Sequence, residues 1–392
     1  MNGIIKARGK KRTLTNAKRG MLLNGESGKK AHGDYLLVIA VTVLALVGTV
    51  FIYSASNYSA ASTYNDAFYF VKKQLIGIAF GVVAMVGTSL FDYKKLQKFT
   101  VIVSIVSFVT LALVFVPGIG VENYGAKRWI GLGSFTIQPS EIAKFAMILF
   151  CANYVSNRPD KPKSFKGILP ILIFGGATCL FIIAEPNMSI TVCVAMLMLT
   201  LLFASGVKIK SLLVIIIPAL IAGVALIFAE PYRLSRLMAF LNPWSNPKGE
   251  GYQLIQSLYA LGSGGWFGVG LFNSRQKYAF LPFAESDFIL SVIGEEIGFI
   301  GLLFFFALIG FIIYRGLKTA SKAKDLFGFM LAVGITMIFG IQAVINALVV
   351  TGSIPPTGLP LPLVSSGNTS IIIFMAEMGI IFNISKQSSL TF

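Results

Sequence analysis

Long apolar runs recur along nearly the whole chain, and they constrain its fold more than any other feature. About 20 helical residues span the hydrocarbon core of a bilayer, and several runs reach roughly that length. Only 12% of the 392 residues are charged, whereas a soluble domain carries about 25%. Because backbone groups in lipid must be satisfied within their own segment, each run predicts a transmembrane α-helix. A water-soluble enzyme with a single anchor is therefore excluded.

The runs predict an all-α polytopic membrane protein with ten spans. The eighth run is too long for one plain span, so we expect its first part to lie in a cavity or at the outer interface. No cleavable signal peptide is apparent, because a polar stretch leads straight into a full-length span. We expect a basic, disordered tail at 1–33, a membrane domain at 34–386 and a short tail at 387–392. The spans are expected at about 35–54, 69–90, 99–116, 139–155, 167–184, 189–206, 211–229, 286–314, 327–350 and 362–384.

The distribution of basic residues predicts the orientation. The first 33 residues and alternate connections after them hold 23 of the 33 Lys and Arg residues. The positive-inside rule makes that side cytoplasmic, with both termini on it. We interpret the net charge of +17 as this topology signal together with attraction to anionic membrane lipids. Nucleic-acid binding is disfavoured, because no soluble module carries a basic stripe interleaved with aromatic residues.

Cysteine and histidine are scarce, which removes several kinds of site. The three cysteines, Cys151, Cys179 and Cys193, fall in predicted spans, where they are expected to fill the core rather than form disulfides. The only histidine, His32, lies in the tail. Catalysis by a Ser-His-Asp triad and a histidine-based zinc site are therefore excluded, and no metal site is predicted.

Two outer loops, at about 117–138 and 230–285, are long enough to be functional. The second, between the seventh and eighth helices, is rich in aromatic residues, so we expect it to be structured. Its glycine-rich GSGGWFGVG stretch lacks the ending of a P-loop, and we expect its glycines to permit tight turns and close backbone approach near a ligand or lipid. The loop's cations run against the positive-inside bias, which indicates either a phosphate-bearing ligand or ordinary contact with headgroups and water. These cations are Arg233, Arg236, Lys248, Arg275 and Lys277.

Charged residues inside the predicted spans are a further signal. Glu141 and Lys144, at the start of the fourth span, share a helix face and can pair. Pro139 suits the helix start, where Gln138 or Ser140 can help to cap it. Such a pair marks either a functional cavity or a contact that only fixes helix packing.

Asp287 stands where the chain re-enters the membrane from the second outer loop. Burial there would raise its pKa and a nearby cation would lower it, so it can serve as a general base. The alternative is a helix N-cap, for which Ser286 is a rival. Glu295 and Glu296 point about 100° apart on a helix. We expect one to face a cavity and the other to accept from a neighbouring helix or outer-loop cations.

Two further patterns concern packing. The stretch TGSIPPTGLPLPLVSSGNTS, between the last two spans, is expected either to line a cavity at membrane depth or to form an extracellular turn. The stretch GIAFG, Gly77 to Gly81, fits the small-xxx-small pattern of close helix contact, within the chain or with a partner.

Four long motifs, in order, resemble the SEDS family, which contains FtsW, RodA and SpoVE. The resemblance covers nearly all of the chain beyond the basic tail. The stretches NPW at 242–244 and SRQK at 274–277 are more similar to the FtsW/SpoVE branch, whereas TGLPLP at 357–362 would also suit RodA. The motifs are KRWIGLGSFTIQPSEIAKFA, NPWSNPKGEGYQLIQSLYALGSGGWFGVGL, SRQKYAFLPFAESDFILSVIGEEIGFIG and TGLPLPLVSSGNTS.

This resemblance implies a peptidoglycan glycosyltransferase in the cytoplasmic membrane of a bacterium. Such an enzyme polymerises lipid II into glycan at the outer face, by inverting transglycosylation, with a class B penicillin-binding protein and other divisome or elongasome proteins as partners. Asp287 matches the family's essential aspartate, and Glu141, Lys144 and Arg128 match its other motifs.

The mechanism that the resemblance implies makes Asp287 the general base toward a sugar hydroxyl. Fixed cations would hold the leaving diphosphate, because charge aimed at developing charge is often the largest catalytic contribution. A divalent cation (Mg or Mn) can share the diphosphate, although the sequence shows no dedicated cage. The residues expected to bind substrate or support Asp287 are Lys127, Arg128, Glu141, Lys144, Arg275, Lys277, Ser286, Glu295 and Glu296.

The sequence departs from the family pattern at 185–189, at Glu285 and at 365–370. These departures leave open a specialised or less active paralogue. Two other functions remain as alternatives, namely a lipid II flippase or transporter, whose intramembrane charges would look similar, and a non-catalytic scaffold of the division or sporulation machinery.

Overall fold

A computed structural model describes residues 33–388 except for 124–125, 133–134, 230 and 279. The expected basic tail therefore lies outside the described residues, apart from Gly33. A helix coincides with each of the ten expected spans, namely α2–α8 and α11–α13. The elements are α2 (Tyr35–Tyr64), α3 (Tyr69–Leu90), η1 (Tyr93–Lys95), α4 (Leu96–Leu113), β1 (Gly120–Asn123), β2 (Ala126–Leu132), β3 (Phe135–Ile137), α5 (Pro139–Asn157), η2 (Lys161–Lys163), α6 (Phe165–Ala184), α7 (Met188–Ala204), α8 (Ile209–Ala229), α9 (Pro231–Leu241), η3 (Pro243–Ser245), α10 (Tyr252–Gly264), α11 (Ile289–Ser321), α12 (Leu326–Val350) and α13 (Asn368–Gln387).

Eight helices of the described chain are long and apolar enough to cross a membrane, namely α2, α3, α4 with η1, α6, α8, α11, α12 and α13. Helix α7 is apolar but shorter, and the 19-residue α5 carries two charged side chains. The chain is therefore an integral membrane protein. The full count of ten crossings stays a prediction.

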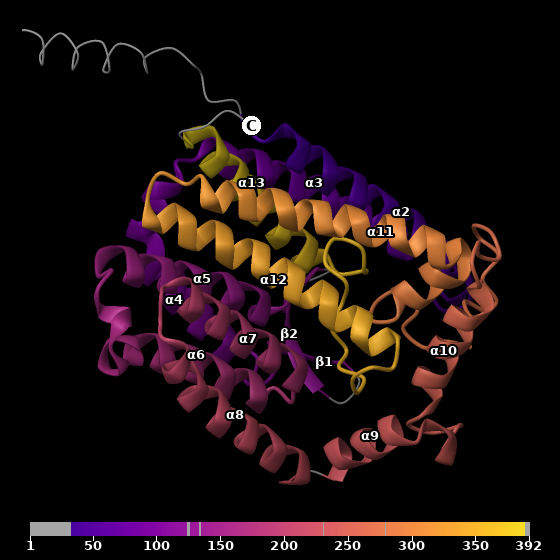
Figure 1. The fold of residues 1–392 in the computed structure, drawn as a ribbon. Coiled ribbons are helices and arrows are strands. Elements are labelled where there is room, and N and C mark those ends of the chain that lie inside the picture. Colours follow the sequence, from indigo (N-terminus) through magenta and orange to yellow (C-terminus); the bar gives the residue numbers. More distant parts are fainter. Residues whose placement is uncertain (1–32, 124–125, 133–134, 230, 279, 389–392) are drawn as a thin grey trace, which may run out of the picture.

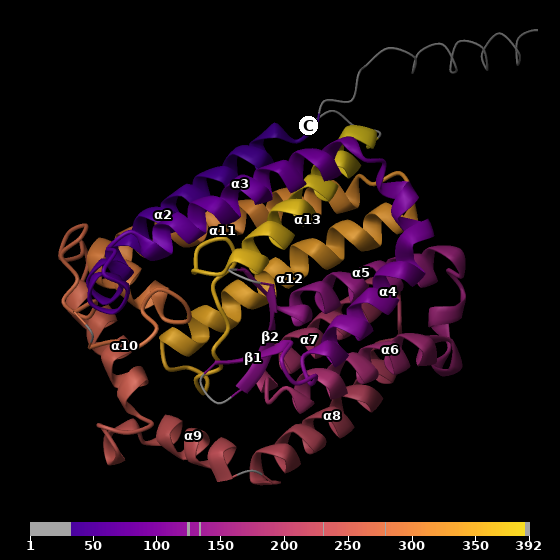
Figure 2. The same ribbon diagram turned by 180° about the vertical axis from the view of Figure 1, so that it is seen from behind.

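The helices form two groups that share α12 (Figures 1 and 2). Helices α2, α3, α11 and α13 pack together on one side of α12, and α4, α5, α6 and α7 pack on the other. Helix α12 is the most buried of the candidate spans. From α7 the chain continues as an arc through α8 and α9 and rejoins the body at α10 (Figure 1). Leu212 is the one buried residue within the described part of α8.

The GIAFG stretch brings α3 against α13. A Cβ atom added at Gly77 would lie 2.9 Å from Ile371, and one added at Gly81 would lie 2.5 Å from the sulfur of Met375. The close helix contact predicted from the pattern is therefore confirmed. It lies within the chain, where α13 occupies the surface that a partner helix would need.

The first of the long loops folds into a small antiparallel sheet that was not predicted from the sequence. Its order is β1-β2-β3, with Gly120 opposite Ile130 and Ile130 opposite Ile137. The Thr369 hydroxyl at the start of α13 donates to the Thr136 carbonyl (2.9 Å). We call this end of the molecule the sheet end, and the opposite end, where residues 92–95 meet 383–387, the η1 end.

Helix α11 is interrupted at Gly298, whose φ of 67° and ψ of −173° are not helical. The expectation that this run is too long for one plain span is confirmed. The segment 264–270 packs into the break, where the Val269 N–H donates to the Glu295 carbonyl (3.0 Å). A Cβ at Gly268 would lie 2.1 Å from the Glu296 carbonyl oxygen. The predicted close backbone approach is thus present, and its neighbour is α11 itself.

Candidate active site around Asp287

Two segments that are distant in sequence meet at Asp287. One is the stretch 282–288 that precedes α11, and the other is the stretch 351–367 between α12 and α13. The buried Asn346 of α12 joins them, because its amide donates to the backbone carbonyls of Asp287 (2.8 Å) and Leu359 (2.7 Å).

Two serines hold the second segment against the first. The Ser365 hydroxyl donates to the Ser286 carbonyl (2.5 Å) and accepts from the Leu361 N–H (2.8 Å). The Ser366 N–H donates to the Glu285 carbonyl (2.9 Å). Four apolar residues of this segment are also buried, which favours the expected lining of a cavity over a solvent-exposed turn. The four are Leu359, Leu361, Leu363 and Val364.

The Asp287 carboxylate lies against the backbone of Gly358. Gly358 has a φ of 68°, and a Cβ there would lie 3.2 Å from the Asp287 Oδ2 atom. Both the left-handed conformation and the close approach favour glycine. The second segment therefore forms the wall on which the carboxylate rests.

Asp287 does not act as a helix cap. Phe288 occupies the N-cap position of α11 and no side chain caps the helix there. Burial raises the pKa of Asp287 to about 6, while Arg128 and Arg236 oppose the shift and Glu285 adds to it. A carboxyl with such a pKa can accept a proton near neutral pH, as a general base must.

Arg128 connects β2 with the α6–α7 turn and with Asp287. Its guanidinium donates to the Pro186 carbonyl (2.6 Å). It also lowers the pKa of both Asp287 and Glu185. Glu185 is buried, and burial nevertheless raises its pKa to about 8. In the sequence Glu185 stands out only as a departure from the family pattern, although an acid at the end of a span is a signal for a site.

A cavity of about 270 Å³ lies between α9, the start of α10 and the two segments that meet at Asp287, although Asp287 itself does not line it. Its walls include Arg236, Lys248 and Tyr252, together with Pro282 and Pro356. Arg236 was recognised in the sequence only as one of several loop cations. Its place near Asp287 follows from the arc of α8 and α9, which periodicity cannot reveal.

Glu295 and Glu296 are both buried, and both hold the segment 272–277. Glu295 accepts from the Arg275 N–H (3.0 Å) and from the Ser274 hydroxyl. Glu296 accepts from the Ser54 hydroxyl and the Ser274 N–H (3.3 Å). Glu296 thus accepts from a neighbouring helix, α2, as expected for one of the two acids, and that either faces a cavity stays a prediction.

The predicted phosphate-binding cations differ in their surroundings. Lys277 is buried, donates to the Phe272 carbonyl and lies 4.0 Å from a carboxylate oxygen of Glu296. Its ammonium is thus engaged within the loop. The side chains of Lys127 and Arg275 are exposed, and their part in substrate binding stays a prediction.

The predicted pair of Glu141 and Lys144 is present, with 2.7 Å between the Lys144 Nζ and the Glu141 Oε1 atoms. Both side chains are buried, and the ammonium lies 5.3 Å from the centre of the Phe374 ring. Glu377 of α13 is buried within electrostatic range of both. Glu377 is not among the residues predicted from the sequence, although an acid within a predicted span is itself a signal of function.

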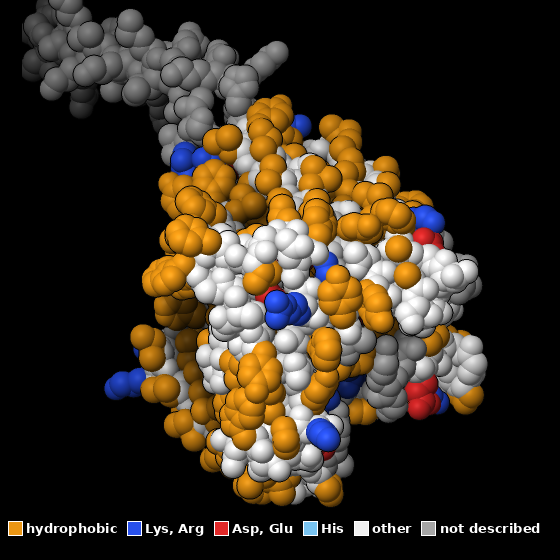
Figure 3. Space-filling view, turned by 90° about the vertical axis from the view of Figure 1, so that its right-hand side faces the viewer, with side chains coloured by type: hydrophobic (Ala, Val, Ile, Leu, Met, Phe, Trp, Pro, Cys, Tyr) orange, Lys and Arg blue, Asp and Glu red, His pale blue; other side chains and the backbone are white. Residues whose placement is uncertain are grey.

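Figure 3 views the molecule from its α10 side, where scattered cations and a few carboxylates are set among hydrophobic and uncharged groups. Within the described part of the chain, no three His, Cys, Asp or Glu side chains are grouped to hold a metal ion. The fold and site define a polytopic membrane protein with a half-buried carboxylate, flanked by cations, at the sheet end of its helices.

Comparison with known proteins gives the family. A family model described as "Cell cycle protein", for the FtsW, RodA and SpoVE proteins, matches residues 34–390. The chain belongs to this family, as its motifs predicted.

Proteins named FtsW and SpoVE, the two members of the branch predicted from the motifs, are both similar to the chain. Stage V sporulation protein E of Bacillus subtilis (strain 168) is 38% identical over 361 residues, which cover 92% of this chain and 99% of that protein. A protein named "Probable peptidoglycan glycosyltransferase FtsW" from Trichlorobacter lovleyi is 40% identical over 356 residues, with 91% and 93% covered.

Solved structures share the fold. One, described as "Structural coordination of polymerization and crosslinking by a peptidoglycan synthase complex", has a TM-score of 0.76 at 25% identity and covers 91% of this chain and 98% of its own. The rod shape determining protein RodA of Thermus thermophilus has a TM-score of 0.67 at 23% identity, with 91% and 97% covered.

Proposed function

We propose that this protein is a peptidoglycan glycosyltransferase that polymerises lipid II at the outer face of the cytoplasmic membrane. The observation that carries the proposal is Asp287, a half-buried carboxylate whose pKa is raised to about 6 beside Arg128 and Arg236. Relatives that align over about nine-tenths of the chain and are named as such glycosyltransferases support it.

In the proposed reaction, the Asp287 carboxylate accepts the proton of an acceptor sugar hydroxyl. The hydroxyl oxygen then forms a bond to the anomeric carbon of the growing chain. The bond from that carbon to the lipid diphosphate breaks with inversion, and the diphosphate leaves with the electron pair. Arg128 and Arg236 would offset the charge that develops on the leaving group, which favours the transition state over the ground state.

The distribution of cations supports an orientation in which the η1 end is cytoplasmic and the sheet end faces outward. Asp287 would then lie where a lipid-linked substrate presents its sugars. We further propose a class B penicillin-binding protein as the partner. The similar structure described as a synthase complex that coordinates polymerisation and crosslinking supports this choice.

The test is a polymerisation assay with purified protein, lipid II and the partner if activity requires it. Asp287→Asn keeps the shape of the side chain and should fold but make no glycan, since loss of a general base costs about 10²–10⁴-fold in rate. Asp66→Asn, which changes a partly exposed acid between α2 and α3, is the matched control and should polymerise normally.

Two outcomes would overturn parts of the proposal. Normal polymerisation by Asp287→Asn would show that another group is the base. If the parent protein made no glycan but moved labelled lipid II across liposome membranes, it would be a transporter instead.

A further inference from the structure

A groove on the membrane-facing side of α4, α5 and α6 lies away from Asp287. It encloses about 550 Å³ and is lined by residues 100–109 of α4, residues 150–158 at the end of α5, and Phe174 of α6. Its lining is mainly apolar, and its floor is aromatic. The Phe150 and Phe174 rings stack with 4.4 Å between centroids, and Phe108 meets Phe174 edge-on at 5.2 Å.

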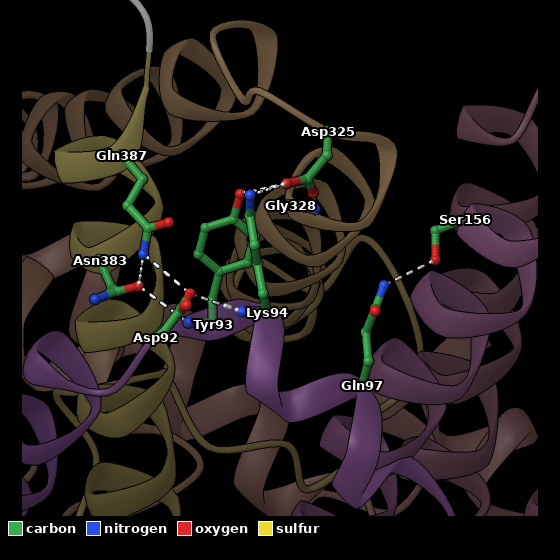
Figure 4. Close-up of polar contacts among 9 residues, drawn as sticks. All are labelled: Asp92, Tyr93, Lys94, Gln97, Ser156, Asp325, Gly328, Asn383 and Gln387. Atoms are coloured by element: carbon green, nitrogen blue, oxygen red, sulfur yellow. Dashed lines mark hydrogen bonds and ion pairs between the residues drawn. The ribbon is translucent and has the colours of Figure 1, made fainter.

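One end of the groove is polar. The Asn157 amide donates to the Asn153 side chain (2.7 Å), and the Tyr154 hydroxyl donates to the Gly167 carbonyl (2.7 Å). The exposed Arg158 guanidinium lies 5.6 Å from the centre of the Tyr154 ring. Gln97 of α4 donates to Ser156 of α5 (3.3 Å), which holds the two helices together at this end (Figure 4).

The charge at this end is positive. From 158 to 166 the sequence is RPDKPKSFK, with four Lys and Arg residues against a single Asp. Lys98 on α4 adds an exposed cation near the first residue of the groove lining. An occupant with an anionic head at this end would complement these charges, and each basic residue near a membrane surface contributes about 1 kcal/mol toward anionic lipid.

The length of the groove matches one leaflet of a bilayer. A rise of 1.5 Å per residue over 100–109 gives about 13 Å, and half of a 30 Å hydrocarbon core is about 15 Å. An acyl chain that begins at the polar end would therefore fill the groove without crossing the bilayer midplane. A water-soluble peptide or a free anion would leave the aromatic floor without a partner.

We propose that this groove binds a glycerophospholipid with an anionic headgroup, with its phosphate at Arg158 and an acyl chain along the Phe108, Phe150 and Phe174 floor. In the orientation proposed above, the lipid belongs to the cytoplasmic leaflet. The site is therefore separate from the glycosyl transfer site, which takes its substrate at the opposite face.

The test is native mass spectrometry of the delipidated full-length protein with phosphatidylglycerol or phosphatidylcholine of identical acyl chains. Phosphatidylglycerol should bind at least about fivefold more tightly, and Arg158→Gln should reduce that preference by about fivefold. Ser104→Trp should fill the groove and displace both lipids, because Ser104 is a small residue of its lining. Glycerol phosphate, which carries the headgroup charge without acyl chains, should not bind.

Matched controls separate this site from general membrane contact. Lys210→Gln removes an exposed cation at the start of α8, and Val214→Trp enlarges an exposed side chain on the same helix. Both should bind phosphatidylglycerol as the parent protein does. If Lys210→Gln weakened binding as much as Arg158→Gln, or if Ser104→Trp retained its lipid, the proposal would be overturned.

Discussion

Helix α12 has one polar cluster at each of its ends. The two clusters differ in how their carboxylates are hydrogen-bonded and in the direction in which a carboxylate pKa is shifted. At the η1 end, Asp325 caps α12 by accepting from the Gly328 N–H (2.7 Å), and it also accepts from the Tyr93 hydroxyl (2.6 Å). Asn383 of α13 accepts from the Tyr93 N–H (3.1 Å). Figure 4 shows these groups pointing toward one another from α12, α13 and η1.

Asp92, next to Tyr93, shows how donors at this end lower the pKa of a carboxyl group. Asp92 accepts from the Gln387 amide (3.1 Å) and from the Lys94 N–H (3.1 Å). The hydrogen bond from Gln387 is the main reason why the pKa of Asp92 lies below its usual range, and nearby lysines add to it. Asp92 is thus held ionised by its donors, which suits a structural role.

At the sheet end, burial outweighs the groups that lower the pKa of the carboxylate. Asn346 binds the backbone of Asp287 rather than its carboxylate. The carboxylate lies against Gly358, and burial raises its pKa in spite of two arginines. The difference teaches that position in the protein, rather than residue type, decides whether an aspartate stabilises the fold or can exchange a proton.

The largest effect should come from breaking the buried ion pair at the η1 end. Arg315 donates its Nε–H to Asp34 (2.8 Å), and both side chains are buried. Asp34→Asn would leave the buried Arg315 charge without its carboxylate, so we expect a loss of about 3–5 kcal/mol in stability. Thermal melting in detergent would measure it.

The control for that change is Asp66→Asn, which breaks the exposed pair with Lys72 (2.8 Å). It should shift the melting temperature little or not at all, because exposed pairs contribute weakly. Equal shifts for the two variants would show that burial does not distinguish the two pairs.

The next effect concerns the wall behind Asp287. Gly358→Ala would place a methyl group 3.2 Å from the carboxylate at a φ of 68°. Because small displacements of a reacting group can cost about 10²-fold in rate, we expect glycan synthesis to fall by about 10–100-fold.

Gly352→Ala supplies the same backbone strain elsewhere. Its φ is 66°, and the nearest atom to an added Cβ is the end of the flexible Leu254 side chain, at 3.3 Å. The two variants should lose similar stability, but only Gly358→Ala should lose activity. Similar activities would mean that contact with the carboxylate does not matter.

The pKa of Asp287 predicts a pH dependence. Activity should rise with pH through about 6 as the carboxylate ionises. Because the folded-state pKa is above the unfolded value, stability should fall as pH rises from about 4 to about 6, by about 3 kcal/mol.

Asp287→Asn removes this titration. Its melting temperature should exceed that of the parent at pH 7 but not at pH 4. A difference that is constant with pH would argue against a raised pKa.

The smallest effect should come from Tyr93→Phe, which removes one hydrogen bond to Asp325. We expect a loss of about 1 kcal/mol in stability, since Asp325 keeps the Gly328 N–H as a donor. Glycan synthesis at temperatures well below the melting point should be unchanged. A large loss of synthesis without a loss of stability would show that the η1 end also takes part in the reaction.

The local sequence was informative wherever a signal lies within one element. The apolar runs predicted where helices lie, because lipid demands continuous apolar helical segments. The i,i+3 spacing predicted the pair of Glu141 and Lys144, and the glycines at 77 and 81 predicted a close helix contact. The motif around Asp287 singled out a carboxylate whose structural surroundings match a general base.

The sequence by itself thus determined the class of protein, its helices and Asp287 as the central candidate, because these depend on hydropathy, short spacings and motifs. Only the tertiary structure decided what surrounds Asp287. It brought in Gly358, Arg128 and Arg236 from three distant elements, covered Glu295 and Glu296 with the loop, and added a small β-sheet. The physical reason is that burial and electrostatic neighbours depend on how separate helices and loops pack, which no local pattern records.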